Sequence, residues 1–360
     1  MPRKTDSPFA GNVLSTRVQG LTRLTSLRRR DFLKTTGLAV TRLVVTNPLT
    51  ALSNFDTMKD SDNFDVIIIG GSYSGLSAAM ALGRSLRSLL VIDSGHPCNW
   101  QTPRSHNFIT HDGAKPSTIV ASAKAQILNY STVKFISDLA VSGKKIDNGF
   151  EITTKLGNSF KTRKLIFATG VRDIMPEIDG FSECWGISII HCPYCHGYEV
   201  RNEITGFLAN GDAALHYAKL VMNLSKKLTI FTNGKASFTN EEREKLSRHS
   251  IKIVEKEVLR FEHTNGYIES IVFKDESSTP LKALYAKLSF AQHSDIPENL
   301  GCTLFDQGLI KVDTFQKTSV DGVYACGDNS SFLRSVANAV ATGNFTGAAV
   351  NSELCDEEFN

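Results

Sequence analysis

The sequence predicts an α/β fold that contains two Rossmann-like dinucleotide-binding units. The pattern strand, small-residue turn, helix, strand occurs at residues 64–95 and again at residues 203–231. Two further apolar segments, 164–170 and 322–328, read as strands that end in small-residue turns. A chain of 360 residues is long enough for about two domains of ordinary size.

The overall composition, 41% hydrophobic and 21% charged, is typical of a globular protein. The net charge of +3 is unevenly distributed, because residues 1–57 carry nine Lys and Arg against three acidic residues. The remainder carries 31 basic and 34 acidic residues, and no basic stripe indicates a nucleic-acid partner.

The basic N-terminal segment contains "SLRRRDFLKTTG" at residues 26–37, which resembles a twin-arginine export signal. The matching residues are Arg29, Arg30, Phe32, Leu33 and Lys34. The apolar stretch that follows is interrupted by Arg42 and is too short to span a membrane. We therefore expect residues 1–61 to be a leader and the protein to be exported to the periplasm. A disordered leader, or a start at Met58, is the alternative and would leave the protein in the cytoplasm.

The first turn, Gly70-Gly71-Ser72-Tyr73-Ser74-Gly75, follows a short β-branched run and predicts a dinucleotide site. Glycines in such a turn allow a tight bend and close approach to a pyrophosphate, although Ser72 here replaces the middle glycine. Asp93 ends the next strand, 23 residues after Gly70, where a carboxylate can accept hydrogen bonds from a ribose. A buried unit without ligand is the alternative.

The segment "IIHCPYCHGYEV", residues 189–200, holds Cys192 and Cys195 with two residues between them. A nearby cation or helix end lowers the pKa of one thiol in such a pair, which favours thiol–disulfide exchange. The flanking His191 and His196 are too close in sequence to complete one tetrahedral zinc shell, so we expect no metal. A structural disulfide is the other alternative. The remaining five cysteines are scattered and do not form a disulfide framework, at Cys98, Cys184, Cys302, Cys326 and Cys355.

Two later motifs, "ATG" at 168–170 and "TSVDGVYACGD" at 318–328, resemble signatures of flavoproteins with two dinucleotide domains. With the CxxC pair just before the second unit, residues 63–354 resemble low-molecular-weight thioredoxin reductase and its relatives. The resemblance implies that the second domain is inserted in the first. It also implies FAD as cofactor and a homodimer. The expected ranges are 62–172 with 291–360 for the split FAD domain, and 173–290 for the CxxC domain.

The resemblance also implies roles for individual residues. Asp328 would hold the ribityl chain of the flavin, and the small-residue helix from about Ser335 to Leu354 would point its N-terminus at the flavin ring. Cys195 would face the flavin, and Cys192 would exchange with an external dithiol or disulfide. The implied cofactor-binding residues are Gly70, Ser72, Gly75, Asp93, Asn107, Ala168, Thr169, Gly170, Gly327, Asp328, Ser335 and Val336.

Several histidines are further candidates. His196 stands where the reductases have an aspartate as general acid. A histidine there can transfer protons near neutral pH or, as a cation, stabilise a thiolate. His106 and His293 could line the flavin, although a surface or core role is the alternative for each.

The second turn, residues 209–214, departs from a nicotinamide-binding pattern. Ala209 replaces the first glycine, and Asp212 adds negative charge where phosphates would lie. The next strand ends at 232–234 without an arginine pair for NADPH or an acid for NADH. Gly211 remains the candidate contact for a nicotinamide cofactor. The pattern predicts a retained fold with eroded binding, which resembles the flavin-dependent dithiol oxidases of the gliotoxin type.

Three functions are therefore compatible with the sequence. The first is an NADPH- or NADH-dependent disulfide reductase, and the second is an oxidase that passes electrons from a dithiol to oxygen. The third is a non-catalytic flavin redox sensor. A small dithiol or disulfide, or a thioredoxin-like protein, is the expected substrate.

Overall fold

The computed structural model describes residues 63–360 of the chain. The twin-arginine-like segment and Met58 lie outside the described residues. No helix within residues 63–360 is both long and apolar enough to cross a membrane.

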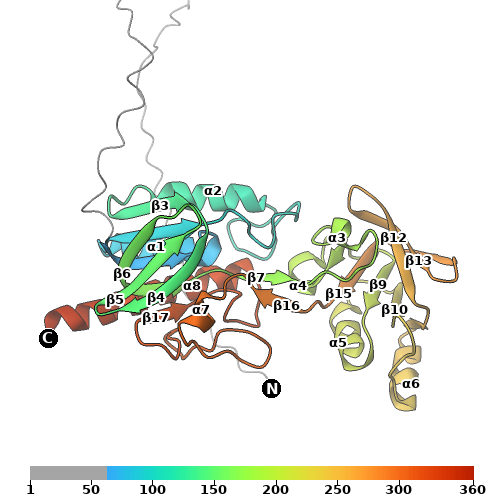
Figure 1. The fold of residues 1–360 in the computed structure, drawn as a ribbon. Coiled ribbons are helices and arrows are strands. Elements are labelled where there is room, and N and C mark those ends of the chain that lie inside the picture. The colour runs from blue at the N-terminus through green and yellow to red at the C-terminus, as the bar shows by residue number, and fades with distance from the viewer. Residues whose placement is uncertain (1–62) are drawn as a thin grey trace, which may run out of the picture. The chain divides into compact units, whose positions relative to one another are not determined.

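A seven-stranded sheet forms the first unit, in the order β3-β2-β1-β6-β5-β4, with β17 paired to β6 (Figure 1). Its strands are β1 (Asn63–Ile69), β2 (Leu89–Asp93), β3 (Val133–Ser137), β4 (Ala140–Ile146), β5 (Gly149–Thr154), β6 (Ser159–Phe167) and β17 (Val323–Ala325). β2 pairs parallel with β1 and with β3, and β6 pairs parallel with β1 and with β17. In contrast, β5 pairs antiparallel with β4 and with β6. A strand from late in the sequence therefore completes the first sheet.

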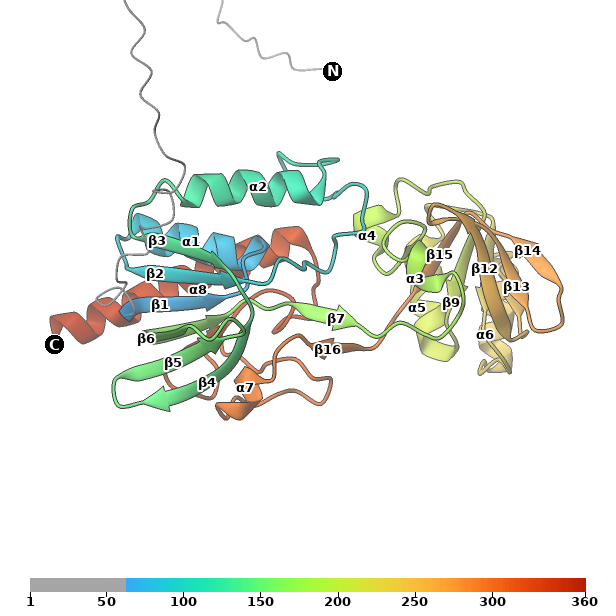
Figure 2. The same ribbon diagram turned by 45° about the horizontal axis from the view of Figure 1, so that its top comes forward.

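Three helices cover one face of this sheet: α1 (Tyr73–Arg84), α2 (Pro116–Ile127) and α8 (Val336–Phe359) (Figure 2). Side chains alternate along β1, so Val66 and Ile68 pack under these helices. Ile67 and Ile69 point to the other face, where β5 and α7 (Ile296–Asn299) cover them. The β-branched strand is thus buried on both faces, as its unbroken apolar run predicts.

The second unit is a parallel five-stranded sheet in the order β11-β10-β9-β15-β8. Its strands are β8 (Ile189–Ile190), β9 (Thr205–Leu208), β10 (Leu228–Phe231), β11 (Lys252–Val254) and β15 (Ala283–Ala286). One apolar cluster packs this sheet against α5 (Gly211–Val221) and α6 (Asn240–Arg248). A second cluster packs it against α3 (Phe181–Cys184) and the antiparallel strands β12 (Val258–Thr264) and β13 (Tyr267–Phe273). The strand β14 (Ser278–Pro280) pairs with β13.

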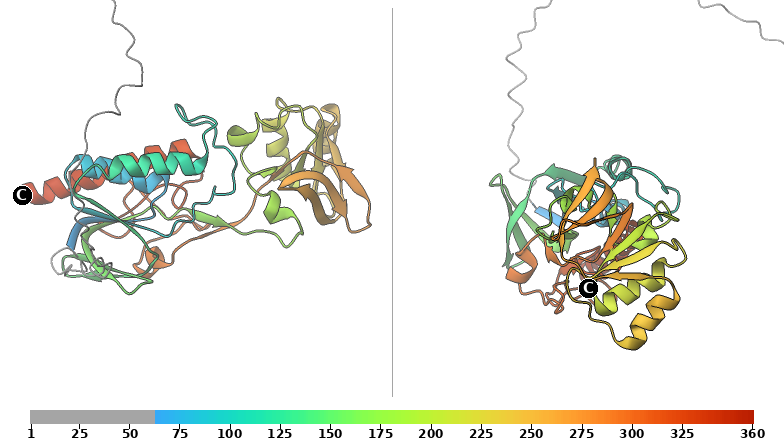
Figure 3. Two further views of the ribbon diagram at one scale, coloured as in Figure 1. Left: turned by 90° about the horizontal axis from the view of Figure 1, so that it is seen from above. Right: turned by 90° about the vertical axis from the view of Figure 1, so that its right-hand side faces the viewer.

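The chain enters and leaves the second unit through one antiparallel pair, β7 (Val171–Asp173) and β16 (Phe290–Gln292) (Figure 3). Asp173 lies opposite Phe290 in this ladder. The fold therefore consists of two Rossmann-like units, the second inserted in the first, as the sequence predicts.

Candidate functional site

A large cleft opens where β1, β2 and β6 end, and we call it the main cleft. Its walls include residues 69–74, 92–94 and 168–171, which are the carboxyl ends of these strands and the turns after them. It extends from these turns to Asp328 and to Ser335 at the start of α8. Ligands of open α/β sheets bind at the carboxyl ends of the strands, so the main cleft lies where a dinucleotide would bind.

The glycine-rich turn is tightly packed at the base of the main cleft. Gly70 has φ +108°, and an added Cβ would lie 2.2 Å from the Ala168 carbonyl oxygen. A Cβ on Gly75 would lie 1.8 Å from the carbonyl oxygen of Gly70. Ser72 is the N-cap of α1, but its side chain makes no capping hydrogen bond. The first amides of α1 therefore lack a side-chain cap where a pyrophosphate would bind.

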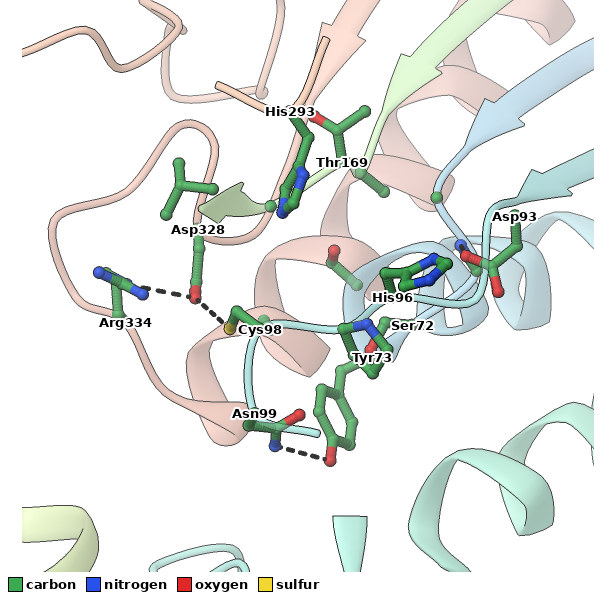
Figure 4. Close-up of a pocket in the computed structure, with 18 of the residues that line it drawn as sticks. Ser72, Tyr73, Asp93, His96, Cys98, Asn99, Thr169, His293, Asp328 and Arg334 are labelled. Atoms are coloured by element: carbon green, nitrogen blue, oxygen red, sulfur yellow. Dashed lines mark hydrogen bonds and ion pairs between the residues drawn. The ribbon is translucent and has the colours of Figure 1, made fainter. Parts of the chain in front are cut away.

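Asp93 lies beside this turn at the end of β2 (Figure 4). Its Oδ1 accepts a hydrogen bond from the Gly71 amide, with N and O 3.0 Å apart. The carboxylate therefore both fixes the turn and presents acceptor oxygens to the main cleft, an arrangement that fits a ribose.

A buried carboxylate, Asp328, lines the main cleft near Arg334 and Cys98 (Figure 4). Its Oδ2 lies 3.6 Å from Arg334 Nε and 3.9 Å from Cys98 Sγ. Burial raises the pKa of Asp328 to about 6, against the opposing effect of Arg334. Ser335 caps α8 by accepting a hydrogen bond from the Asn338 amide at 3.1 Å.

The cysteine pair lies on the short helix α4 (Pro193–His196), with Cys192 as its N-cap. The two sulfur atoms are 2.6 Å apart, and Cys192 Sγ accepts a hydrogen bond from the Cys195 amide at 3.2 Å. The hydrogen bond from the Cys195 thiol, together with backbone amides of α4, lowers the pKa of Cys192 to about 7. The hydrogen bond that Cys195 donates to Cys192, together with burial, raises the pKa of Cys195. Cys192 is therefore the thiol that ionises first.

The two cysteines border different cavities. Cys195 lines the main cleft, whereas Cys192 lines a second cavity, which we call the Cys192 pocket. Apolar and aromatic side chains dominate the walls of the Cys192 pocket, among them Trp185, Tyr217, Leu220, Leu288, Phe332 and Leu333. The arrangement lets one sulfur face a cofactor while the other faces a substrate.

His191 and His196 also line the main cleft. Within residues 63–360, neither ring nitrogen of His196 has a hydrogen-bond partner, and His191 Nε2 also lacks one. Burial lowers the pKa of each imidazole to about 4, with a further contribution from His106 at His196 and from Arg334 at His191. Both imidazoles are therefore neutral at pH 7, which favours a proton-transfer role for His196 over a cationic one.

Most of the predicted cofactor residues meet in the main cleft. Those that line it are Gly70, Ser72, Asp93, Ala168, Thr169, Gly170, Asp328, Ser335 and Val336, with His106 and His293. Gly75 packs behind the turn, and Gly327 donates its amide to Thr342 Oγ1 at 3.1 Å. Asn107 does not line the main cleft; its amide binds Asp112 Oδ1 at 2.8 Å.

The sequence analysis did not single out Tyr73, Asn99, Cys98 or Arg334, although all four line the main cleft. Cys98, Asn99 and Arg334 lie outside the glycine and cysteine motifs, and Tyr73 occupies a variable position of the glycine-rich turn. Only their position after a strand end or before a helix start could have indicated them.

The second turn is closed by its own side chains. Asn210 Oδ1 accepts hydrogen bonds from the Gly211 amide at 2.9 Å and from the Ser237 amide at 2.8 Å. Asn210 Nδ2 donates to the Lys235 carbonyl at 2.9 Å. The amide of Gly211, the predicted contact for a nicotinamide cofactor, is thus already paired.

The residues after β10 are likewise used within their own loop. The Thr232 hydroxyl donates to the Gly234 carbonyl at 2.6 Å. Asn233 Oδ1 accepts from the Val258 amide at 2.7 Å. These side chains stabilise the loop instead of facing a ribose. Among residues 63–360, no group of three or more His, Cys, Asp or Glu side chains is arranged to hold a metal ion.

Comparison with known proteins agrees with this geometry. Residues 64–343 match the family model described as pyridine nucleotide-disulphide oxidoreductase. Thioredoxin reductase tcpT of Claviceps purpurea is 35% identical over 308 residues, covering 82% of this chain and 96% of that protein. Thioredoxin reductase aclD of Aspergillus oryzae is 32% identical, with coverage of 82% and 98%. The crystal structure of an oxidoreductase from Agrobacterium tumefaciens is 33% identical, with a TM-score of 0.77 and coverage of 81% and 99%.

The matched residues include the glycine-rich turn, the cysteine pair and the Gly327–Asp328 motif. The main cleft, with the N-terminus of α1 and the carboxylates of Asp93 and Asp328, fits FAD, and Cys195 of the thiol pair borders it. The chain belongs to the pyridine nucleotide-disulphide oxidoreductase family and is an FAD-dependent thiol–disulfide oxidoreductase of the thioredoxin reductase-like type.

Proposed function

We propose that this enzyme oxidises a dithiol at Cys192 and Cys195, and that dioxygen rather than a nicotinamide is its redox partner. The observation that carries the proposal is the hydrogen bonding of the second turn. Asn210 Oδ1 accepts hydrogen bonds from the Gly211 amide and from the Ser237 amide of the next loop. Asp212 adds negative charge at the start of α5, where it opposes a pyrophosphate.

The thiol chemistry follows from the two cavities. In the oxidised enzyme, a substrate thiolate attacks Cys192 Sγ from the Cys192 pocket. The Cys192–Cys195 bond breaks, and Cys195 leaves as a thiolate on the side of the main cleft. The second substrate thiol then displaces Cys192, so the substrate leaves as a disulfide and both cysteines are reduced. The substrate has lost two electrons and two protons.

His196 receives a proton in this scheme, because it follows Cys195 and its buried imidazole is neutral at pH 7. FAD, when bound in the main cleft, supplies two-electron redox chemistry between the reduced cysteine pair and dioxygen, which takes up two electrons and two protons as hydrogen peroxide. Both cysteines border their cavities in one conformation, so this exchange requires no rotation of the CxxC unit.

We assign the binding of FAD to the predicted residues that line the main cleft. Gly70 and Ser72 with the α1 amides would hold the pyrophosphate, Asp93 the ribose and Asp328 the ribityl chain. The proposed domain boundaries are those expected from the sequence, with residues 173–290 as the CxxC domain. A homodimer and twin-arginine export also belong to this proposal.

We propose a small dithiol as the substrate, in preference to a thioredoxin-like protein. Apolar side chains such as Leu220, Leu288 and Leu333 line the Cys192 pocket. A mostly apolar cavity of this kind suits a small apolar molecule.

Anaerobic reduction of the bound flavin tests the direction of electron flow. NADPH, NADH and dithiothreitol are added separately to the full-length, FAD-loaded enzyme, and the flavin absorbance is followed. We expect dithiothreitol alone to bleach the flavin and air to restore it. Rapid bleaching by NADPH or NADH would instead identify a reductase and overturn the proposal.

Cysteine variants test whether the bleaching of the flavin by dithiothreitol depends on Cys192 and Cys195. Cys192→Ser and Cys195→Ser should each abolish bleaching by dithiothreitol. Cys355→Ser is the matched control, because Cys355 is an exposed cysteine near the end of the chain. A flavin that no thiol reduces in the wild-type enzyme would favour the redox-sensor alternative.

A further inference from the structure

The carboxylate of Asp173, at the end of the connecting strand β7, joins residues from both units. It binds Arg334 of the first unit through two hydrogen bonds, at 2.7 Å to Nη1 and 3.2 Å to Nη2. It also accepts a hydrogen bond from Trp185 Nε1 of the second unit at 3.2 Å. The side chains of Asp173 and Arg334 are only 6% and 15% exposed, so the ion pair is largely shielded from water.

This cluster forms the wall between the main cleft and the Cys192 pocket. Arg334 and His191 line both cavities, and Asp173 and Trp185 line the Cys192 pocket. The Trp185 ring lies against the His191 ring, with centroids 6.1 Å apart, and His191 directly precedes Cys192. A chain of contacts therefore runs from Arg334 through Asp173 and Trp185 to the cysteine segment.

The charges explain why Asp173 is the central member of this chain. Within residues 63–360, Asp328 is the other carboxylate beside Arg334, and Arg334 Nε lies 3.6 Å from it, beyond a normal hydrogen bond. Without the Asp173 carboxylate, a buried guanidinium would lose its bidentate partner and Trp185 would lose its acceptor. Burying an unpaired charge is costly, so arrangements that let water reach Arg334 would become more populated.

We propose that Asp173 is a positioning residue of the thiol–disulfide reaction. By binding Arg334 and Trp185 together, it keeps the cysteine segment docked, with Cys195 at the main cleft and Cys192 at its own pocket. It touches neither sulfur and acts through the two residues that it joins. The proposal rests on the established thiol–disulfide activity and holds for either direction of electron flow.

The test compares two rates in full-length, FAD-loaded Asp173→Asn, in which an amide of nearly the same shape replaces the charge. The first is the anaerobic bleaching of the flavin at saturating dithiothreitol. The second is the alkylation of Cys192 by iodoacetamide in the reduced enzyme. We expect bleaching to slow by roughly 10- to 100-fold, as misplacement of reacting groups does. Alkylation should stay equal or become faster, and the FAD content should be unchanged.

A merely structural role predicts a different result. Asp173→Asn would then lower the melting temperature and leave both rates unchanged, which would overturn the proposal. Asp173→Glu, which restores the charge, should recover part of the bleaching rate. Glu151→Gln is the matched control, because it breaks an ion pair with Lys144 of 2.8 Å on the outer β4–β5 hairpin. This control should not change either rate.

Trp185→Phe keeps the proposal testable if Asp173→Asn does not fold. The phenyl ring can still stack on Phe181, whose ring centroid lies 5.8 Å from that of Trp185, but the donor to Asp173 is lost. We expect slower bleaching with normal FAD content. Bleaching at the wild-type rate would overturn the role of the Trp185 contact. Absence of bleaching in the wild-type enzyme itself would count against the proposed function instead.

Discussion

The two glycine-rich turns of this enzyme follow the same strand–turn–helix plan, yet they present different groups at the helix N-terminus. In the first turn, Ser72 makes no side-chain cap, and Asp93 stands beside the open main cleft. In the second turn, Asn210 binds the Gly211 amide and anchors the turn to the next loop. The first amides of α1 therefore lack a side-chain partner and are left for a ligand, whereas the Gly211 amide of α5 is paired within its own turn.

The comparison shows that the stability of such a unit and its ligand binding depend on different residues. The second unit retains an apolar core around Phe207, Ile230 and Tyr285, and this core holds the sheet against α5. The residues that would bind a nicotinamide lie outside that core, at the turn and after β10. They can therefore change without loss of the fold.

The largest effect expected from this comparison is at the glycines. A Cβ on Gly75 would lie 1.8 Å from a backbone oxygen, whereas on Gly211 the nearest atom would be 3.5 Å away. Gly75→Ala should therefore abolish FAD binding and destabilise the fold by about 3 kcal/mol. Gly211→Ala, where φ is +53°, should cost only about 1 kcal/mol and leave FAD in place.

The ratio of flavin to protein absorbance and the midpoint of urea unfolding measure both variants. Equal loss of flavin in the two variants would contradict the distinction between the turns.

The next effect concerns the end of the strand after the first helix of each unit, where Asp93 ends β2 and Thr232 follows β10. Asp93→Asn weakens an ionic acceptor at the Gly71 amide and at the proposed ribose site. We expect the dissociation constant of FAD to rise by roughly 10- to 100-fold, because hydrogen bonds to charged groups contribute about 1.5–3 kcal/mol. Thr232→Val is the matched change in the second unit, and it should leave FAD affinity unchanged. Fluorescence titration of the apoprotein with FAD measures both dissociation constants. An unchanged dissociation constant in Asp93→Asn would show that Asp93 does not bind FAD.

The pH dependence of Cys192 alkylation tests whether the cysteine pair of the second unit is activated for thiol chemistry. Hydrogen bonds from the Cys195 thiol and from backbone amides lower its pKa to about 7. The thiolate is therefore the minor form at pH 6 and the major form at pH 8. Alkylation of the reduced enzyme by iodoacetamide should rise about tenfold over this range, since only the thiolate reacts.

Mass spectrometry of the Cys192 peptide follows this reaction, with Cys192→Ser as the blank. A half-maximal rate near pH 9, the ordinary value, would show that α4 does not activate the thiol.

The smallest effect should come from reopening the second turn. Asn210→Gly combined with Asp212→Ala frees the Gly211 amide and removes a negative charge beside it. The charge of Asp212 at the helix N-terminus contributes about 0.3–1 kcal/mol, so its removal should raise NADPH affinity by about two- to fivefold. A titration that follows NADPH fluorescence measures it. A gain of several hundredfold would mean that these two residues alone had closed the site.

Local patterns in the sequence predict the two Rossmann-like units and several candidate site residues, whereas the insertion of the second unit was implied by the family resemblance. The β-branched run before Gly70 and the carboxylate at Asp93 predict the first unit, because both signals lie within one strand–turn–helix segment. The spacing of Cys192 and Cys195 is likewise local, and so is the loss of glycine at Ala209.

Only the tertiary structure decided which distant groups meet and how His191, His196 and Asp328 ionise. Asp173 and Arg334 are 161 residues apart in sequence, yet they form the buried pair at the wall between the two cavities. The cavity that each cysteine borders, and the neutral state of His196, also depend on packing across the two units. The physical reason is that burial and charges from distant parts of the chain, both of which shift the pKa of a side chain, are produced by long-range contacts.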